Sequence, residues 1–115
     1  MANRGKAGSG RIPSKVMEYI TDALQGICFG EVVLVAQDGR LIQVERTERR
    51  RVDSWPLSGE ERIAWDRNRE AALCKRIEEE FAGLSYGRLT IAVAQGKIKQ
   101  MSRLEMQRFM DGEGI

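Results

Sequence analysis

Apolar and polar positions follow a helical period and then a strand-like pattern, and this succession occurs twice along the chain. Residues 14–26 carry apolar side chains every three or four positions, which predicts an amphipathic helix. Two short, largely apolar runs follow, separated by Asp38-Gly39, which is a strong signal for a two-residue hairpin turn. A second helical stripe around Ile77 leads into a similar pair of runs around Gln95-Gly96. The pattern therefore predicts two units, each made of a helix and a β-hairpin.

The two units also match residue by residue. Residues 20–48 align without a gap on residues 77–105, an offset of 57 positions. A self-match of this kind is typical of a duplicated supersecondary unit. The identical pairs are Ile20/Ile77, Gly26/Gly83, Gly30/Gly87, Gly39/Gly96, Gln43/Gln100, Arg46/Arg103 and Glu48/Glu105.

This repeat predicts the α+β class: a four-stranded antiparallel sheet with both helices on one face and a pseudo-twofold axis between the units. One unit of about 40 residues could hardly bury its helix stripe alone. The tandem supplies the missing partner within one chain, so we interpret the chain as a fused form of a dimer.

The 115 residues suffice for one domain. Residues 1–11 contain glycine, serine and basic residues and are expected to form a flexible basic tail. Residues 12–115 are expected to form a single domain of two repeats, 12–52 and 69–109. Residues 53–68 would join them as a linker or helix extension.

Helix ends are signalled by capping residues. Ser14 is the expected N-cap of the first helix and Gly26 its stop. Ser58 and Glu61 form a capping-box signature, so the second helix is expected to run from about Gly59 to Ala82.

Taking Asp38-Gly39 as the turn predicts the register of the first hairpin. One face would pair Val35 with Ile42, Val33 with Val44 and Glu31 with Arg46. The other face would pair Ala36 with Leu41, Leu34 with Gln43 and Val32 with Glu45. The face that is apolar in both units is expected to lie under the helices: Val32, Leu34, Ala36, Leu41, Leu89, Ile91, Val93 and Ile98.

The remaining face differs between the units. In the first it carries four aliphatic residues, which we take as a candidate interface: Val33, Val35, Ile42 and Val44. Their counterparts in the second unit are Thr90, Ala92, Lys99 and Met101. An exposed apolar face of this kind favours contact with another protein or with a second copy in a homo-oligomer. The alternative is that the linker, with Trp55 or Trp65, folds back over it.

Charge adds a second functional hypothesis. The formal net charge is only +2, yet four arginines cluster after the first hairpin, and the tail adds further bases. We take this cluster as a set of candidate nucleic-acid contacts, because cationic side chains track phosphates. Aromatic residues suited to base stacking are limited to Phe29 and Tyr86, at matched strand starts. The candidate contacts are Arg46, Arg49, Arg50 and Arg51.

The residue types argue against most site chemistry. The chain has no histidine, the commonest general base at neutral pH and a common zinc ligand. Cys28 and Cys74 lack metal-ligand or CxxC spacing. We therefore expect no catalytic, metal or cofactor-binding residues and a protein that is not an enzyme. An enzyme that uses Cys28 or a carboxylate is the third interpretation.

No apolar run approaches the roughly 20 residues that span a bilayer, and the first residues contain no apolar segment of a secretory signal. A cytoplasmic protein without membrane contact is expected.

The first unit carries a distinctive string of motifs. An Ile-x-Phe-Gly entry leads into an aliphatic strand, then Gln-Asp-Gly and Val-Glu-Arg-Thr-Glu, followed by basic residues. In these motifs, residues 12–52 resemble the YezD-like family of small bacterial proteins of uncharacterised function. The carrying residues are Ile27, Phe29, Gly30, Gln37, Asp38, Gly39, Gln43, Glu45, Arg46, Thr47 and Glu48.

The second unit keeps Tyr86-Gly87 and Gln95-Gly96 but lacks the Gln-Asp-Gly and Val-Glu-Arg-Thr-Glu motifs, so it is the divergent copy. The resemblance implies a helix-hairpin unit in a bacterial cytoplasmic protein and implies no catalytic residue. We expect a non-enzymatic module that acts through protein–protein contact or self-association, with a nucleic-acid-binding accessory protein as the alternative.

Overall fold

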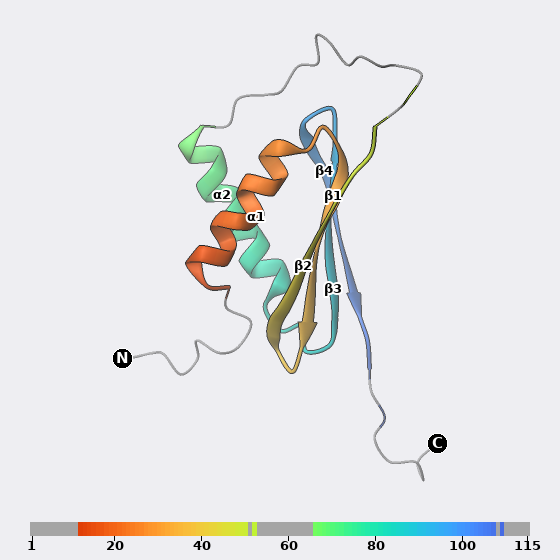
Figure 1. Cartoon of the computed structure of the whole chain (residues 1–115). Coiled ribbons are helices and arrows are strands. Elements are labelled where there is room, and N and C mark those ends of the chain that lie inside the picture. Colours follow the sequence, from red (N-terminus) through yellow and green to blue (C-terminus); the bar gives the residue numbers. More distant parts are fainter. Residues whose placement is uncertain (1–11, 51, 53–65, 108, 110–115) are drawn as a thin grey trace.

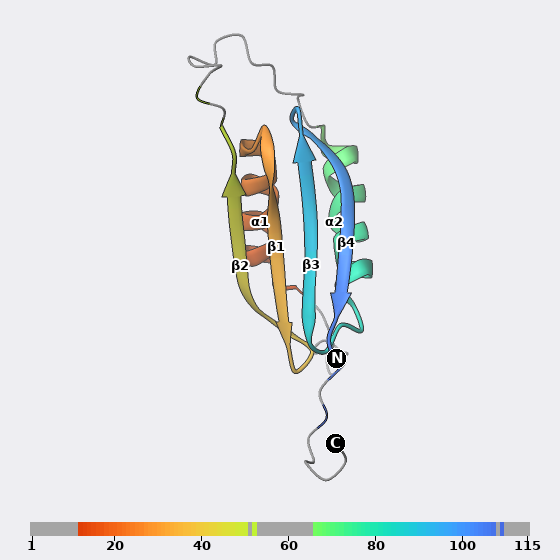
Figure 2. The ribbon, with the colours of Figure 1, turned by 90° about the vertical axis from the view of Figure 1, so that its right-hand side faces the viewer.

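The computed structural model describes residues 12–50, 52, 66–107 and 109, which form one sheet and two helices (Figure 1). The elements, in chain order, are α1 (Ser14–Gly26), β1 (Phe29–Gln37), β2 (Arg40–Glu48), α2 (Arg67–Phe81), β3 (Gly87–Ala94) and β4 (Lys97–Glu105). The four strands are antiparallel to their neighbours in the order β2-β1-β3-β4. Both helices lie on one face, α1 behind β1 and β2 and α2 behind β3 and β4 (Figure 2). The predicted α+β fold is confirmed.

The core fills the space between the helices and the sheet. Side chains from both helices and from the two central strands are fully buried there. All the residues predicted to lie under the helices are either buried or packed against this core. The largest fully buried side chains are Phe81, Ile20, Leu24, Ile27, Leu34, Ile77, Leu84, Leu89, Ile91 and Val32.

The two units have the same internal geometry. Gly30 pairs with Glu48 in the first hairpin, and Gly87 pairs with Glu105 in the second, 57 positions later. Each unit also docks its turn on the other: the Gly39 N–H donates to the Ser85 carbonyl, and the Gly96 N–H donates to the Cys28 carbonyl. Gly39 and Gly96 are 57 positions apart, and so are Cys28 and Ser85, so each bond is the counterpart of the other with the units interchanged. The units are therefore related by the predicted pseudo-twofold axis.

The aromatic–glycine motif at each strand start has a steric cause. Gly30 has φ +156°, and a Cβ there would lie 2.0 Å from the Thr47 carbonyl oxygen. Gly87 has φ +151°, and its Cβ would lie 2.0 Å from the Leu104 carbonyl oxygen. No side chain fits at that separation, so both positions require glycine where the first strand of each hairpin meets the end of the second.

The second helix begins later than expected. α2 starts at Arg67, with Asp66 as its N-cap: the Arg69 N–H donates to the Asp66 carboxylate over 2.8 Å, and the Asp66 backbone is extended. A helix running from Gly59 through Asp66 is therefore wrong, because a side chain already caps the first turn here. The Ser58–Glu61 signature lies outside the described residues.

The first helix also has a different N-cap. Pro13 takes that place, and its carbonyl accepts from the N–H groups of Val16 and Met17. Ser14 is the first helical residue. Gly26 ends this helix as predicted, and Gly83, with φ +80°, follows the end of α2.

A β-bulge in each edge strand changes the predicted register. Val35 pairs with Gln43 and Ala36 with Leu41, so Ile42 is an extra residue without a partner. Lys99 is the extra residue at the same place in β4. From the bulge onward every pair moves by one position, which also reverses the faces of the second strand.

The predicted pairs Val35/Ile42, Val33/Val44, Glu31/Arg46, Leu34/Gln43 and Val32/Glu45 are therefore wrong, and only Ala36/Leu41 holds. The observed pairs are Val35/Gln43, Leu34/Val44, Val33/Glu45, Val32/Arg46 and Glu31/Thr47.

Candidate functional site: the open face of the sheet

The face of the sheet opposite the helices is covered by no element that the structure describes (Figure 2). We call it the open face. Its central residue, Val33, is 9% exposed although no described helix lies over it. Val35 is half-buried, and Ile42 in the bulge is 52% exposed. Three of the four candidate interface residues thus lie on this face, by the alternation of the strands.

Val44, the fourth candidate, lies on the other face. It pairs with Leu34, which is fully buried under the helices, and it packs against the core. Its predicted place was wrong because the bulge at Ile42 adds one residue before it. Met101 in the second unit changes face for the same reason and also packs against the core.

Leu104 is a residue of the open face that the sequence interpretation missed. It pairs with Arg88, which in turn pairs with Val35, and it is 50% exposed. Val35 and Leu104 lie in one row across the strands with Arg88 between them, and Ile42 lies beside the end of this row, next to Gln43 in the bulge. We call Ile42, Val35 and Leu104, with Val33 in the neighbouring row, the aliphatic row. The sequence holds no signal that places Leu104, because its face depends on the bulge at Lys99.

Arg46 is exposed, but its guanidinium lies beside the end of α1 rather than on the open face. A Cβ on Gly26, the last residue of α1, would lie 3.3 Å from Nη2 of Arg46, so this guanidinium lies at the carboxyl end of the helix. Arg103 holds the equivalent place, 3.8 Å from the Cβ position of Gly83 after α2. Cations stabilise helix carboxyl ends, because unpaired carbonyls give that end a partial negative charge. The repeated arginine thus occupies the same place, beside a helix carboxyl end, in both units.

The other described arginines of the cluster form ion pairs. Arg49 lies 3.5 Å from Glu31, and Arg50 lies 3.4 Å from Glu48. Glu48 also lies 3.4 Å from Arg46. Carboxylates thus accompany each of the three candidate nucleic-acid contacts that the structure describes, and this lowers the local positive potential. Arg51, the fourth candidate, lies outside the described residues.

The two strand-start aromatics differ in their contacts. Tyr86 donates a hydrogen bond from its hydroxyl to the Asp38 carboxylate in the turn of the other hairpin. Phe29, its counterpart, has no hydroxyl, and Gln95 stands in place of Asp38. Phe29 is 45% exposed. Because a hydrogen bond fixes Tyr86 to the turn, the two rings do not form an equivalent pair of stacking platforms.

The cysteines show no sign of an activated nucleophile. Cys28 is buried at the start of the first hairpin. Burial raises the pKa of the Cys74 thiol, and the neighbouring carboxylates of Glu70 and Glu78 raise it further. A catalytic thiol needs the opposite shift. In the described part of the chain, no three residues of the metal-ligating types gather into a site.

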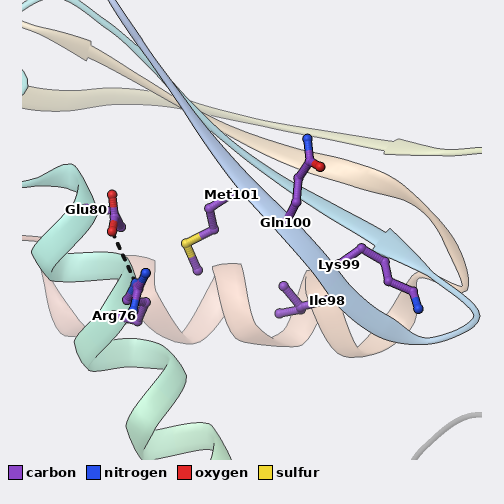
Figure 3. Close-up of a pocket in the computed structure, with 6 residues that line it drawn as sticks. All are labelled: Arg76, Glu80, Ile98, Lys99, Gln100 and Met101. Atoms are coloured by element: carbon purple, nitrogen blue, oxygen red, sulfur yellow. Dashed lines mark ion pairs between the residues drawn. The ribbon is translucent and has the colours of Figure 1, made fainter.

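A shallow pocket of about 230 Å³ lies between α2 and the edge strand β4 (Figure 3). Ile98 and Met101 supply apolar walls, and Lys99 and Gln100 line the strand side. On the helix side, Arg76 forms an i,i+4 ion pair with Glu80 at 3.2 Å. The pocket's charged helix residues already pair with each other, and this shallow surface shows no convergence of polar groups typical of a ligand site.

The comparisons with known proteins match one unit only. The sequence model of a family described as "Uncharacterized small protein (DUF2292)" matches residues 16–52, which include most of α1 and all of β1 and β2. No curated protein and no solved structure matched the chain. The first helix-hairpin unit is thus similar to a family of small uncharacterised proteins. Neither described helix is long and apolar enough to cross a membrane.

Proposed function

We propose that this protein is a non-enzymatic protein–protein interaction module that self-associates through the open face of its sheet. The observation that carries the proposal is the aliphatic row: Ile42 and Leu104 are each about half exposed, and Val33 and Val35 lie between them. A two-layer domain normally presents polar residues on such a face, so aliphatic side chains there favour a covering partner.

The size of the face is adequate for a dimer. The strands contain eight or nine residues each. With strands about 4.8 Å apart and a rise of about 3.3 Å per residue, four strands give a projected area of roughly 600 Å². Two such faces bury roughly 1,200 Å², the lower limit of a stable specific interface.

The edges of the sheet are less suitable for association than its face. The extra residues Ile42 and Lys99 interrupt the ladders of the two edge strands. Charged residues also line both edge strands, including Arg40, Glu45 and Lys97. Bulges and charges on edge strands oppose strand addition. Self-association is therefore proposed through stacked faces rather than through a continuous sheet.

We also infer that the chain arose by tandem duplication of one helix-hairpin unit. The residue-by-residue match at an offset of 57, the bulges at Ile42 and Lys99 and the glycines at the two strand starts support this origin. The identity of the ancestral unit as a YezD-like protein of the bacterial cytoplasm rests on the motifs of residues 12–52. The nucleic-acid alternative stays a prediction, and the ion pairs of Arg49 and Arg50 do not favour it.

Light scattering of matched variants tests the proposal. Ile42→Lys places a charge on the open face, and Tyr19→Lys places one on α1, at a residue of nearly equal exposure. Ile42→Lys is expected to reduce the solution mass from a dimer to a monomer, whereas Tyr19→Lys is expected to leave it doubled. Equal masses for the two variants, with both folded by circular dichroism, would contradict the proposal.

A further inference from the structure

We propose that two copies stack their open faces about a twofold axis parallel to the strands, so that Ile42 of each copy contacts Leu104 of the partner subunit. This inference rests on the proposed self-association and adds its geometry. Two simple twofold axes are available between stacked faces, one along the strands and one across them. Charge and apolar positions on the open face distinguish these two arrangements.

Among the described strand residues, the acidic side chains of the open face lie on the first hairpin only, where Arg49 pairs with Glu31. Glu31 and Glu45 lie on the β1–β2 half, opposite Thr47 and Val33 in the register. The β3–β4 half carries Arg88, paired with Val35, and the bulge residue Lys99. Arg40 and Lys97 occupy equivalent positions beside the two turns and do not distinguish the halves.

This separation selects the axis. A twofold axis along the strands places the β1–β2 half of one copy over the β3–β4 half of the partner. Glu31, level with Ala92, and Glu45, level with Ser102, then lie nearest to Lys99 of the partner subunit, while the partner's Arg88 lies four residues further along β3. An axis across the strands would place carboxylates over carboxylates and cations over cations. Like charges brought together across an interface are unfavourable, whereas opposite charges favour the matching orientation. Glu31 already forms an ion pair with Arg49, whereas Glu45 accepts a hydrogen bond from the neutral Gln43 amide, which leaves its charge uncompensated by that contact.

The aliphatic row fits the same axis. Rotation about an axis along the strands keeps each residue at its height and exchanges the two edges of the sheet. Ile42, at the β2 edge, therefore lies over Leu104 of the partner subunit, at the β4 edge. Each is about half exposed in the single chain, and the contact occurs twice in the dimer. Val35 lies between them, in the row of Leu104, and is covered by the partner sheet.

Divergence between the units explains why the face is self-complementary. Glu31 corresponds to Arg88, and Ile42 corresponds to Lys99, at the offset of 57. Two identical hairpins would present the same charge on both halves. The charge reversal at Glu31/Arg88 and the cation at Lys99 instead give the two halves different net charges, so an axis along the strands brings unlike halves together.

Thiol cross-linking in the full chain tests the geometry. The variants are Ile42→Cys and Leu104→Cys, each combined with Cys74→Ser, because Cys28 is buried and Cys74 is only partly so. Stacked sheets lie about 10 Å apart, beyond the Cα separation that a disulfide bridges, so a short bismaleimide reagent replaces direct oxidation. The solution mass of each variant is measured first.

An equimolar mixture of the two variants is expected to give a cross-linked dimer, and neither variant alone is expected to give one. A dimer from Ile42→Cys alone would place the axis across the strands and overturn the geometry, while the proposed function would stand. A doubled mass without any cross-link would also overturn the geometry and leave the proposed function standing. A monomeric mass for the unmodified protein would overturn both.

Discussion

Val33 in β1 lies directly opposite Thr90 in β3, the residue that follows it by 57 positions. Each of the two is therefore paired with its own counterpart, and the pseudo-twofold axis passes between them. The pairs on either side are also counterparts of each other: Glu31 pairs with Ala92, and Val35, the counterpart of Ala92, pairs with Arg88, the counterpart of Glu31. A single unit that formed a homodimer through β1 would place residue 33 opposite its own copy in the same way.

This relationship predicts that the pair can be reversed. Val33→Thr combined with Thr90→Val is expected to change the free energy of unfolding by less than about 0.5 kcal/mol, since the same two side chains occupy equivalent places. Val33→Thr alone is expected to cost about 1 kcal/mol, because a hydroxyl then replaces a methyl group at a buried site. Urea denaturation at equal protein concentration measures both. A double variant less stable than Val33→Thr would contradict the axis.

Gly30 is expected to tolerate no side chain. Gly30→Ala brings a Cβ to 2.0 Å from the Thr47 carbonyl, so the strand end must separate from its partner. We expect a loss of about 2 kcal/mol or more in the free energy of unfolding. Gly39→Ala is the matched control, since Gly39 has φ +73° but nothing within 4 Å of its Cβ position. Its cost is expected to be about 1 kcal/mol, from backbone strain alone. Equal costs in thermal or urea denaturation would argue against the contact.

Arg46 is expected to stabilise the end of α1. Arg46→Met should lower the free energy of unfolding by about 0.5–1 kcal/mol, with a smaller effect at high salt, because the guanidinium charge at the helix end is lost. Arg49→Met is the control: its side chain is 62% exposed in a surface ion pair with Glu31, which is worth little. Chemical denaturation at two salt concentrations compares the variants. A larger effect of Arg49→Met would contradict the role given to Arg46.

The Cys74 thiol is expected to react slowly at neutral pH. Its raised pKa keeps it protonated to higher pH in the folded chain than in the unfolded one. Its contribution to stability is accordingly present below the ordinary thiol pKa and declines as the pH rises through that value toward the raised one. Glu70→Gln removes a carboxylate that raises the pKa, so alkylation at pH 8 should become faster.

Glu79→Gln, on an exposed position of the same helix, is the control and should leave the alkylation rate unchanged. The rate of modification by iodoacetamide, measured by mass spectrometry, decides between the variants. Faster reaction at pH 7 than an unstructured peptide cysteine would contradict the raised pKa.

The repeat made most of the fold predictable. The match at an offset of 57 and the turn signals at Asp38-Gly39 and Gln95-Gly96 lead to the sheet and its pseudo-twofold axis. The bulge at Ile42 was not predictable, because neither turn chemistry nor hydrophobic pattern separates Ile42 from Val44 as an aliphatic strand residue. Only the pairing with β1 shows that one of them has no partner.

The candidate surface was therefore predictable in part. Val33 and Val35 precede the bulge, so their face followed from the turn, whereas every residue after the bulge was assigned to the wrong face. Arg46 illustrates the consequence. As a member of a basic run it indicated phosphate contacts, but the shift brings it to the helix face, at the end of α1. The glycine at position 26 leaves space for it there.

The most direct test of self-association through the open face is the solution mass of the unmodified protein by light scattering, at low and high salt. A mass of twice the 13.0 kDa chain is expected at both salt concentrations, because the contact of the aliphatic row does not depend on salt. A mass of one chain at both salt concentrations would contradict it.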